Sequence, residues 1–446
     1  MTDESPGRSR DLRSRDRKAG GEVDSTGGST AVPLTEPGDG TPDPITTESG
    51  LAQVVARFAA GTGPVAVDAE RASGYRYTHR AYLVQLRRAG AGTALIDPLP
   101  LADLAALQAA IVDAEWILHA ASQDLPCLAE LGLRPKKLFD TELAARLAGY
   151  ERVGLAALTE QLLGHGLEKH HSAADWSTRP LPRDWLTYAA LDVELLVELR
   201  ELLGAELVRQ GKAEWAAQEF AALVDSAAQP PRTRPDPWRR TSGIHKVRGP
   251  RALARVRALW YARDAVAVRR DTAPGRILPD SAIIAAADAD PKDERSLVAL
   301  TGFGGRSVRR LARTWLDALD EARELSVEEL PVTPPSEGPP PPHRWAERDP
   351  AAAARLARCR EVVNRLATTH AVPPENLLAP DAVRRLAWAP PEPAVDRRLA
   401  DPAQVPARDV AAVWAALKEY GARLWQIELT ATELTEALAP PAITHE

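Results

Sequence analysis

Short apolar runs separated by turns dominate residues 64–97 of this chain. The runs PVAVDAE, AYLVQLRR and TALIDP are rich in residues that favour strands, so they predict a strand meander. Helical spacing follows at 101–111 and 122–132, on either side of the strand-like run EWILHA. A second helical stretch extends from 155 to 208 and is interrupted around 164–182. Strands mixed with helices over this length predict a single α/β domain.

The rest of the chain shows helical patterns separated by segments rich in proline. Helical spacing covers 249–325 and 345–436, and the segments AQPPRTRPDPWRRT and LPVTPPSEGPPPP are predicted to be linkers. The first 47 residues carry too little apolar surface to offset chain entropy, so we predict that they are disordered. The expected order is a disordered tail, an α/β domain, a linker, a helical domain, a Pro-rich linker and a C-terminal helical domain, at 1–47, 48–227, 228–241, 242–326, 327–344 and 345–438.

The charge of the chain is acidic overall but locally basic. Its 446 residues carry a net charge of −6, which gives no global sign of nucleic-acid binding. Within 236–325, however, 18 Lys and Arg residues oppose 12 Asp and Glu residues, a net charge of +6. This excess fits either a local nucleic-acid-binding surface or an ordinary Arg-rich solvated face.

The cysteines and the hydropathy bound the cellular setting. Cys127 and Cys359 are far apart and belong to no cluster of metal ligands, which excludes a disulfide framework as the basis of the fold. The N-terminus has no apolar core of signal-peptide length, and no apolar run reaches the ~18 residues of a membrane span. We expect a cytoplasmic protein without a membrane segment.

Two carboxylates lie at the end of the first predicted strand. Asp68 and Glu70 are two residues apart, so a strand directs both to the same face. Neighbouring unpaired carboxylates repel each other, and a hard divalent cation with oxygen ligands relieves that repulsion. A solvated strand end is the alternative, and the pair alone does not decide between the two.

Further acidic residues lie in two other predicted elements. Asp124 falls in the first turn of a helix that Ser122 could cap, where the helix dipole alone would favour a carboxylate. Tyr188 and Asp192 are four residues apart and share a helix face, where they could also simply form a hydrogen bond at the edge of the core. Taken together, four carboxylates and a phenol can hold two divalent ions roughly 4 Å apart, the arrangement used for in-line phosphoryl displacement.

These motifs, in this order, resemble those of a known group of nucleases. VAVDAE, HAASQDL and TYAALDV resemble the three motifs of the DEDD superfamily of 3′–5′ exonucleases, and the spacing of Tyr188 and Asp192 resembles its tyrosine-containing branch. Within that branch, DWSTRPLPRDWLTYAALDV and FDTELAARLAG resemble the ribonuclease D family. The resemblance covers about residues 50–210 and implies an α/β fold like that of ribonuclease H, a mixed sheet flanked by helices.

The resemblance also implies roles for individual residues. The metal ligands, for two divalent cations that are Mg²⁺ or Mn²⁺, would be Asp68, Glu70, Asp124 and Asp192. Tyr188 would position the attacking water. Ala69 departs from the family, which often has Thr there, but it lies on the opposite strand face from the ligands.

Three more residues of this domain are candidates for RNA contact, namely Gln85, His171 and Arg179. Each also has an ordinary interpretation. Gln85 fits a polar position at a strand edge, His171 a solvated loop, and Arg179 a brace for its own loop. The sequence does not separate these interpretations.

The helical segments resemble the modules that follow the catalytic domain in the same family. The positions that resemble an HRDC domain are Leu259, Trp260, Arg263, Asp264, Asp271, Ala273, Pro274, Ile277, Leu278, Pro279 and Asp280. The last segment resembles a second module of this kind, so two all-α HRDC-type domains are expected after the α/β domain. In the family such modules bind nucleic acid weakly, and the candidate phosphate contacts here are Arg269, Arg270, Arg276, Arg306, Arg309 and Arg310. The C-terminal module would complete a ring or clamp around the substrate path, or serve as a structural cap.

The predicted function is metal-dependent hydrolysis at RNA 3′ ends, with release of nucleoside 5′-monophosphates, in the processing of tRNA or another structured RNA. The sequence predicts no particular protein partner. One alternative is a DNA 3′–5′ exonuclease of the same superfamily. Others are a nucleic-acid-binding scaffold without turnover, and a docking protein that acts through the Pro-rich linkers. The intact set of carboxylates with Tyr188 disfavours the scaffold.

Overall fold

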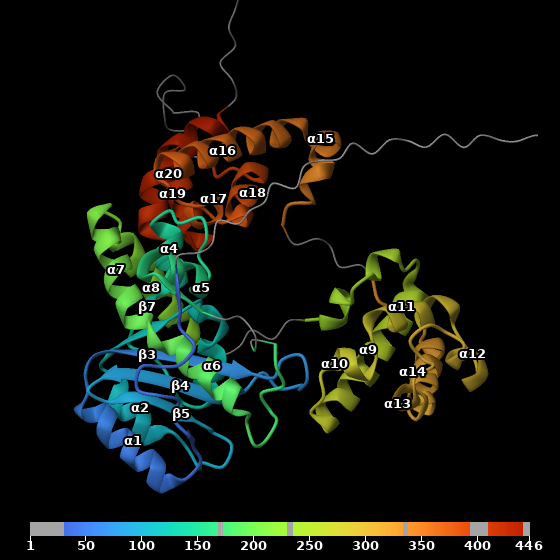
Figure 1. Cartoon of the computed structure of the whole chain (residues 1–446). Helices are drawn as coiled ribbons and strands as arrows, with labels where there is room; N and C mark the ends of the chain where they lie inside the picture. Colours follow the sequence, from blue (N-terminus) through green and yellow to red (C-terminus); the bar gives the residue numbers. More distant parts are fainter. Residues whose placement is uncertain are drawn as a thin grey trace, which may run out of the picture.

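The structure is a computed structural model of the whole chain, and the residues it describes are 31–167, 171, 173–229, 235–332, 338–392 and 409–439. Residues 1–30 of the expected disordered tail and parts of both predicted linkers lie outside these ranges. Figure 1 shows three bodies in chain order: an α/β domain, a helical domain to its right and a C-terminal helical domain above it.

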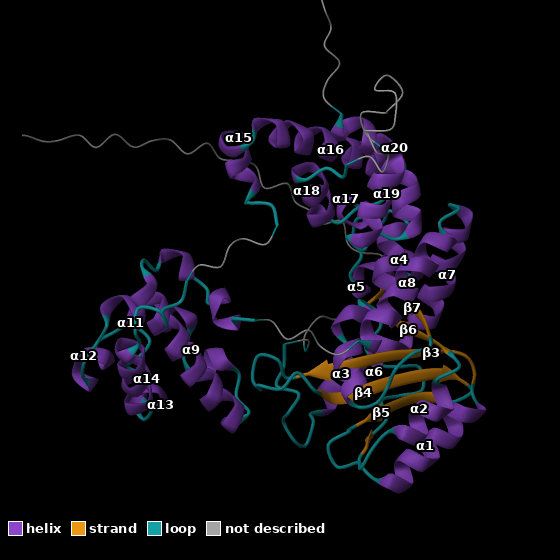
Figure 2. Cartoon of the chain, turned by 180° about the vertical axis from the view of Figure 1, so that it is seen from behind, coloured by secondary structure: helices purple, strands orange, loops and turns teal. Residues whose placement is uncertain are grey.

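A six-stranded mixed sheet forms the centre of the α/β domain, with the strand order β2-β5-β4-β3-β6-β7 (Figure 2). The strands are β2 Pro44–Ile45, β3 Thr62–Arg71, β4 Ala81–Ala89, β5 Gly92–Ile96, β6 Glu115–Leu118 and β7 Lys137–Asp140. The predicted meander is the antiparallel set β3, β4 and β5, and β6 and β7 extend it in parallel. The mixed sheet flanked by helices confirms the predicted fold class.

Helices cover both faces of this sheet. Consecutive residues of the central strands β3 and β4 are therefore buried, although their side chains point to opposite faces. The helices of this domain are α1 Glu48–Ala60, α2 Ala105–Ile111, α3 Leu125–Glu130, α4 Thr141–Leu147, α5 Leu155–Leu158, α6 Arg183–Glu194, α7 Leu196–Arg209 and α8 Ala213–Ala228. Helix α6 lies across β3, β4 and β5 and packs on Leu83 and Leu95. Val84 and Ile96 point to the other face, where Phe58 of α1 belongs to their cluster.

Residues 31–47 are ordered, which corrects the expectation that the tail is disordered through residue 47. Strand β1, Val32–Pro33, pairs in parallel with β8, His165–Gly166, and β2 pairs with β5. These partners lie far along the chain. Local composition reports only how much apolar surface a segment can bury, so it cannot reveal backbone pairing with a distant strand.

The first helical domain packs around its own core and also contacts the sheet domain. Its helices are α9 Pro250–Arg270, α10 Pro274–Ile277, α11 Asp280–Ala289, α12 Glu294–Val298, α13 Arg306–Arg309 and α14 Ala312–Glu324. Trp238 and Trp315 are fully buried in this core. Tyr77, from the loop between β3 and β4, packs against the same core and donates a hydrogen bond of 3.0 Å to Asp264.

The C-terminal domain is joined to the sheet domain through helix α8. Its helices are α15 Trp345–Arg348, α16 Pro350–Thr369, α17 Pro374–Leu377, α18 Pro380–Trp388, α19 Val410–Glu419 and α20 Leu424–Leu438. Trp425 stacks on Trp215 of α8 with ring centroids 4.7 Å apart, and Lys212 donates a hydrogen bond to the Ala371 carbonyl. None of the helices in the described part of the chain is long and apolar enough to cross a lipid bilayer.

Candidate active site

Strand β3 directs two carboxylates toward helix α6. Asp68 and Glu70 share one strand face and are paired across the sheet with Gln85 and Leu83 of β4. Glu70 is only 8% exposed. One oxygen of each carboxylate and one oxygen of Asp192 all lie within 4.8 Å of one another. The strand spacing and the helix spacing seen in the sequence therefore converge on one point.

Asp124 joins this cluster from the turn that follows β6. Its carboxyl group shares a hydrogen bond with Asp68 and lies 3.2 Å from the guanidinium of Arg71. A 3-10 turn, Ala121–Gln123, precedes α3, and Asp124 stands at the N-cap of α3 without accepting a capping hydrogen bond. The helix thus begins later than a cap at Ser122 would place it, and helix capping does not account for Asp124.

The turn that carries Asp124 is held in place by Asp140. This residue caps α4, and its two carboxylate oxygens accept hydrogen bonds of 3.1 and 2.8 Å from the backbone N–H groups of Ala120 and Ala121. Ala120 has a left-handed backbone conformation with φ of 58°, which a side chain disfavours unless its surroundings impose it. Sequence reasoning gave Asp140 no role, although an Asp directly before a helical run is the signal of a cap.

Helix α6 supplies Tyr188 and Asp192, which are joined by a hydrogen bond from the phenol to the carboxylate. The ring of His171 meets the ring of Tyr188 edge-on, with centroids 5.7 Å apart. Nε2 of His171 lies 3.4 Å from a carboxylate oxygen of Asp184, which is also on α6. His171 is therefore beside the catalytic helix, whereas the neighbouring His170 lies outside the described residues.

Burial and mutual repulsion determine the charge of this cluster. Burial raises the pKa of Asp68 to about 6, and burial together with the charge of Asp68 raises the pKa of Asp124 to about 8. Burial and the neighbouring carboxylates also raise the pKa of Glu70 and that of Asp192. Arg71 opposes these shifts at Asp68, Glu70 and Asp124. Several buried carboxyl groups that are difficult to ionise lie together here, and a bound divalent cation would stabilise their ionised form.

Gln85 and Arg71 are polar neighbours of the cluster. Gln85 is fully buried opposite Asp68, and neither atom of its amide has a hydrogen-bond partner among the residues that the structure describes. A buried amide without a hydrogen-bond partner destabilises the fold. The amide of Gln85 is therefore consistent with a site in which a bound group or water forms these hydrogen bonds. In a regular strand, Arg71 would point to the opposite face from Glu70. The pairing of β3 with β4 is irregular between these two residues, and Arg71 contacts Asp124.

Arg179 is engaged by the protein itself. Its guanidinium donates hydrogen bonds to Asp97, at 2.6 Å, and to the backbone carbonyls of Tyr82, at 2.8 Å, and Trp176, at 2.7 Å. These contacts join the loop before α6 to strand β4 and to the residue that follows β5. They support the brace for its loop, and RNA contact by Arg179 stays a prediction.

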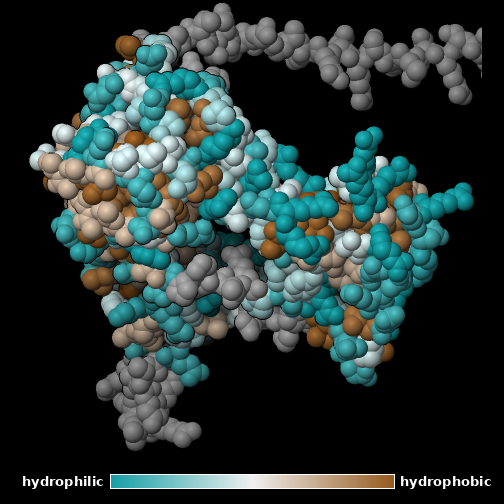
Figure 3. Space-filling model, turned by 90° about the horizontal axis from the view of Figure 1, so that it is seen from below, coloured by the Kyte–Doolittle hydropathy of each residue, from teal (hydrophilic) through white to brown (hydrophobic). Residues whose placement is uncertain are grey.

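The candidate arginines of the first helical domain separate into two groups. Arg276 lies at the junction with the sheet domain, where it donates a hydrogen bond to the Gly74 carbonyl and lies 4.1 Å over the ring of Tyr75. The exposed candidates are Arg269, Arg270, Arg306, Arg309 and Arg310. In Figure 3 the face of this body seen from below is covered mostly by hydrophilic side chains. Arg276 thus holds two domains together, and the exposed five remain candidates for RNA.

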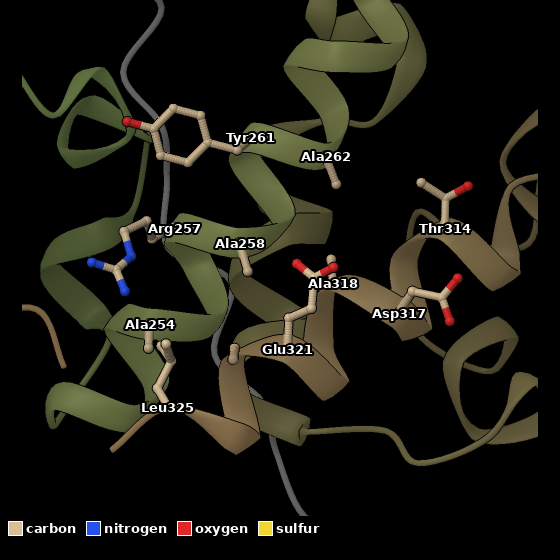
Figure 4. Close-up of a pocket in the computed structure, with 11 residues that line it drawn as sticks. Ala254, Arg257, Ala258, Tyr261, Ala262, Thr314, Asp317, Ala318, Glu321 and Leu325 are labelled. Atoms are coloured by element: carbon tan, nitrogen blue, oxygen red, sulfur yellow. The ribbon is translucent and has the colours of Figure 1, made fainter. Parts of the chain in front are cut away.

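A groove of about 450 Å³ lies between α9 and α14 of the same domain (Figure 4). Arg257 and Tyr261 line it from α9, and Asp317 and Glu321 line it from α14. Two carboxylates in this groove disfavour an anionic ligand. Phosphate contact is therefore expected at the exposed arginines rather than in the groove.

Comparison with known proteins places this chain in a family. Residues 42–208 match the model of a 3′–5′ exonuclease domain, 252–319 match the HRDC domain, and 338–438 match a 3′ to 5′ exonuclease C-terminal domain. The chain is 36% identical to a ribonuclease D from Acidiphilium cryptum, over 75% of this chain and 89% of that protein. It is 34% identical to a ribonuclease D from Gluconacetobacter diazotrophicus, over 79% of this chain and 88% of that protein. The chain belongs to the ribonuclease D family.

Solved structures share the fold of this chain. A crystal structure of a protein from Bifidobacterium adolescentis is 40% identical, with a TM-score of 0.81 over 92% of this chain and 99% of that one. Escherichia coli RNase D, at 24% identity, shares the fold, with a TM-score of 0.64 over 89% of this chain and 98% of that one. Ribonuclease D membership confirms the predicted 3′–5′ exoribonuclease activity. The superfamily depends on divalent metals, and the acidic cluster is in place for them.

Proposed function

We propose that this ribonuclease D family protein shortens RNA from the 3′ end with two divalent cations, Mg²⁺ or Mn²⁺, held by Asp68, Glu70, Asp124 and Asp192. The observation that supports this most directly is the convergence of buried carboxylates from β3, from the turn after β6 and from α6. Carboxylate oxygens are the ligands that these hard cations prefer. The amide of Gln85, opposite Asp68, supports the same proposal, because its nitrogen and oxygen remain available to bind a substrate group or a water in the site.

The side chains divide the chemistry between them. When bound, the cations lower the pKa of a water to yield the nucleophile and stabilise the leaving 3′ oxygen. Tyr188 donates its phenolic hydrogen to Asp192, and this leaves the phenolic oxygen free to accept a hydrogen bond from the attacking water. Attack at phosphorus breaks the bond to the 3′ oxygen of the preceding nucleotide. The products are a nucleoside 5′-monophosphate and an RNA shortened by one nucleotide.

The proposed substrate is a 3′ extension of a structured RNA, such as a tRNA precursor, and the proposed setting is the cytoplasm. Relatives named ribonuclease D support an RNA substrate. Cys127 and Cys359 are buried free thiols, as suits a reducing compartment.

A degradation assay with 5′-labelled strands tests the proposal. RNA and DNA of one sequence are incubated with the protein in Mg²⁺, in Mn²⁺ and in EDTA. We expect a metal-dependent ladder that shortens from the 3′ end of the RNA. Asp192→Asn should abolish it while RNA binding persists, and Tyr188→Phe should slow turnover by about 100-fold or more.

The other outcomes assign other functions. Equal decay of both strands would make the protein a sugar-indifferent exonuclease. Binding without cleavage in either metal would make it a nucleic-acid-binding scaffold, and full turnover by Asp192→Asn would remove that residue from the site.

A further inference from the structure

Arg71 places a positive charge at the edge of the carboxylate cluster. Its guanidinium lies 3.2 Å from a carboxylate oxygen of Asp124, and its side chain is 27% exposed, against 8% for that of Asp124. The charge of Arg71 also reaches the strand carboxylates, because it lowers the pKa values of Asp68 and Glu70 against the effect of burial. One cation of the protein therefore acts on three of the four proposed metal ligands.

A bulge in the sheet brings Arg71 to this position. Glu70 pairs with Leu83 of β4 and Arg71 pairs with Ala81, so the register skips Tyr82. A bulge bends the backbone locally and re-aims the side chains beside it, and bulges are frequent next to active sites. Here the irregularity allows two consecutive residues, Glu70 and Arg71, to act on the same group of carboxylates.

The placement of Asp124 rests on other contacts. The turn before it is held by the hydrogen bonds that Asp140 accepts from the backbone, and the carboxyl group of Asp124 shares a hydrogen bond with that of Asp68. A side chain with these supports does not need Arg71 to hold it at the site. The contribution of Arg71 is therefore expected to be its charge.

Arg71 makes few of the contacts that turn an arginine into a structural brace. Arg179 donates hydrogen bonds to backbone carbonyls and to a carboxylate, whereas among the residues that the structure describes the partner of the Arg71 guanidinium is Asp124. The side chain of Arg71 also borders an open space of about 420 Å³, which Glu70 and Ser73 line as well. A positive charge therefore lies beside the space through which an anionic strand can approach Glu70.

Arg71 changes the net charge of a site that holds two cations. Four ionised carboxylates carry a charge of −4, and Arg71 reduces this to −3. Two divalent cations then bring the site to +1, so a phosphodiester with a charge of −1 enters a site of opposite sign. Without Arg71 the carboxylates would attract cations more strongly, but the site with both cations bound would be neutral toward the phosphodiester.

We propose that Arg71 sets the net charge of the metal site, and that it thereby weakens the binding of divalent cations and strengthens the binding of the phosphodiester. This rests on the proposed function, because the charge matters there only if the four carboxylates hold two cations. Arg71 acts through Asp124 and through the net charge of the site, so it is a positioning residue and not a metal ligand.

Calorimetry on wild type and Arg71→Met tests this. Protein freed of metal with EDTA and then dialysed is titrated with Mg²⁺, and protein saturated with Mg²⁺ is titrated with uridine 5′-monophosphate, which represents the released nucleotide. We expect Arg71→Met to bind Mg²⁺ about threefold more tightly and the nucleotide about threefold more weakly. The loss of a side chain that only supported the fold would weaken the binding of both ligands.

Two further variants control for charge and for position. Arg71→Lys keeps the charge, so it should restore both affinities toward the wild-type values. Arg80→Met is the matched control, because it removes one positive charge from an exposed position directly before β4. The guanidinium of Arg80 lies over the ring of Tyr82, 4.9 Å from its centroid, rather than against a carboxylate of the cluster. Arg80→Met should keep both wild-type affinities.

These binding measurements need no turnover, so they separate the role of Arg71 from the exonuclease assignment. If the two affinities of Arg71→Met do not change in opposite directions, the role of Arg71 is overturned, and an equal effect of Arg80→Met overturns it too. Cleavage of RNA by wild type would then leave the exonuclease assignment intact. If the affinities change as expected but wild type does not cleave RNA, the exonuclease assignment fails instead.

Discussion

At the level of single residues, the clustered carboxylates bind metal but destabilise the metal-free fold. Asp68 is crowded by Glu70, Asp124 and Asp192, so its charge is unfavourable in the metal-free fold. We predict that Asp68→Asn stabilises the EDTA-treated protein by about 1 kcal/mol in chemical denaturation, yet abolishes cleavage. Mg²⁺ should stabilise wild type and give the variant much less. The control is Asp225→Asn, at an exposed position of α8. The prediction is contradicted if metal-free Asp68→Asn protein has a lower free energy of unfolding than wild type.

His119 makes a separate prediction about pH. Burial lowers the pKa of His119 to about 4, with Glu142 opposing the shift and Arg146 adding to it, whereas the unfolded value is near 6.5. The unfolded chain therefore binds the proton first as the pH falls, and stability is lost between pH 6.5 and pH 4. From pH 7.5 to pH 5 this contributes a loss of about 2 kcal/mol. Chemical denaturation with EDTA at both pH values should show this additional loss of stability in wild type but not in His119→Gln. If both proteins lose the same stability between the two pH values, His119 is not the group responsible.

At the level of elements, sequence patterns located what depends on local spacing and missed what depends on distant pairing. The two-residue spacing of Asp68 and Glu70 and the four-residue spacing of Tyr188 and Asp192 were enough to place each pair on one face. Arg71 was missed because its direction depends on a register irregularity against β4. The ordered segment 31–45 was missed because its partners are β8, β5 and α6, and no local pattern reports such contacts.

The loop between β3 and β4 joins the end of the catalytic strand to the first helical domain. One oxygen of Asp271 accepts hydrogen bonds of 3.2 Å from the backbone N–H groups of Tyr77 and Thr78, and the N–H of Ala273 donates to the Tyr75 carbonyl at 3.0 Å. We predict that Asp271→Ala releases this junction. Small-angle scattering should show a larger radius of gyration, and KM for long RNA should rise several-fold while turnover of a dinucleotide is unchanged.

The control for that junction is Asp288→Ala, which removes an exposed carboxylate from α11 of the same domain. It should leave both scattering and KM as in wild type. An Asp271→Ala protein with wild-type scattering would show that the remaining contacts, among them Arg276 with Gly74 and Tyr75, hold the junction without it.

At the level of the whole molecule, RNA must be attracted by a part of a chain that is acidic overall. The net charge is −6, while 236–325 carries +6. Arg306, Arg309 and Arg310 are exposed on and next to α13 of that basic domain. Each phosphate neutralised on a single strand contributes about 0.7 to the slope of log K against log salt. Changing all three to Gln should weaken RNA binding and reduce the slope by up to about 2.

Arg313→Gln is the control, because Arg313 is 85% exposed but already pairs with Asp317 at 2.8 Å. It removes one positive charge from the same domain and should change the slope little. The triple variant should also keep wild-type turnover of a dinucleotide, since the carboxylate cluster lies in the other domain. If the control alters the slope by about a third as much as the triple variant, the effect follows the number of charges removed, and α13 is not where the RNA backbone binds.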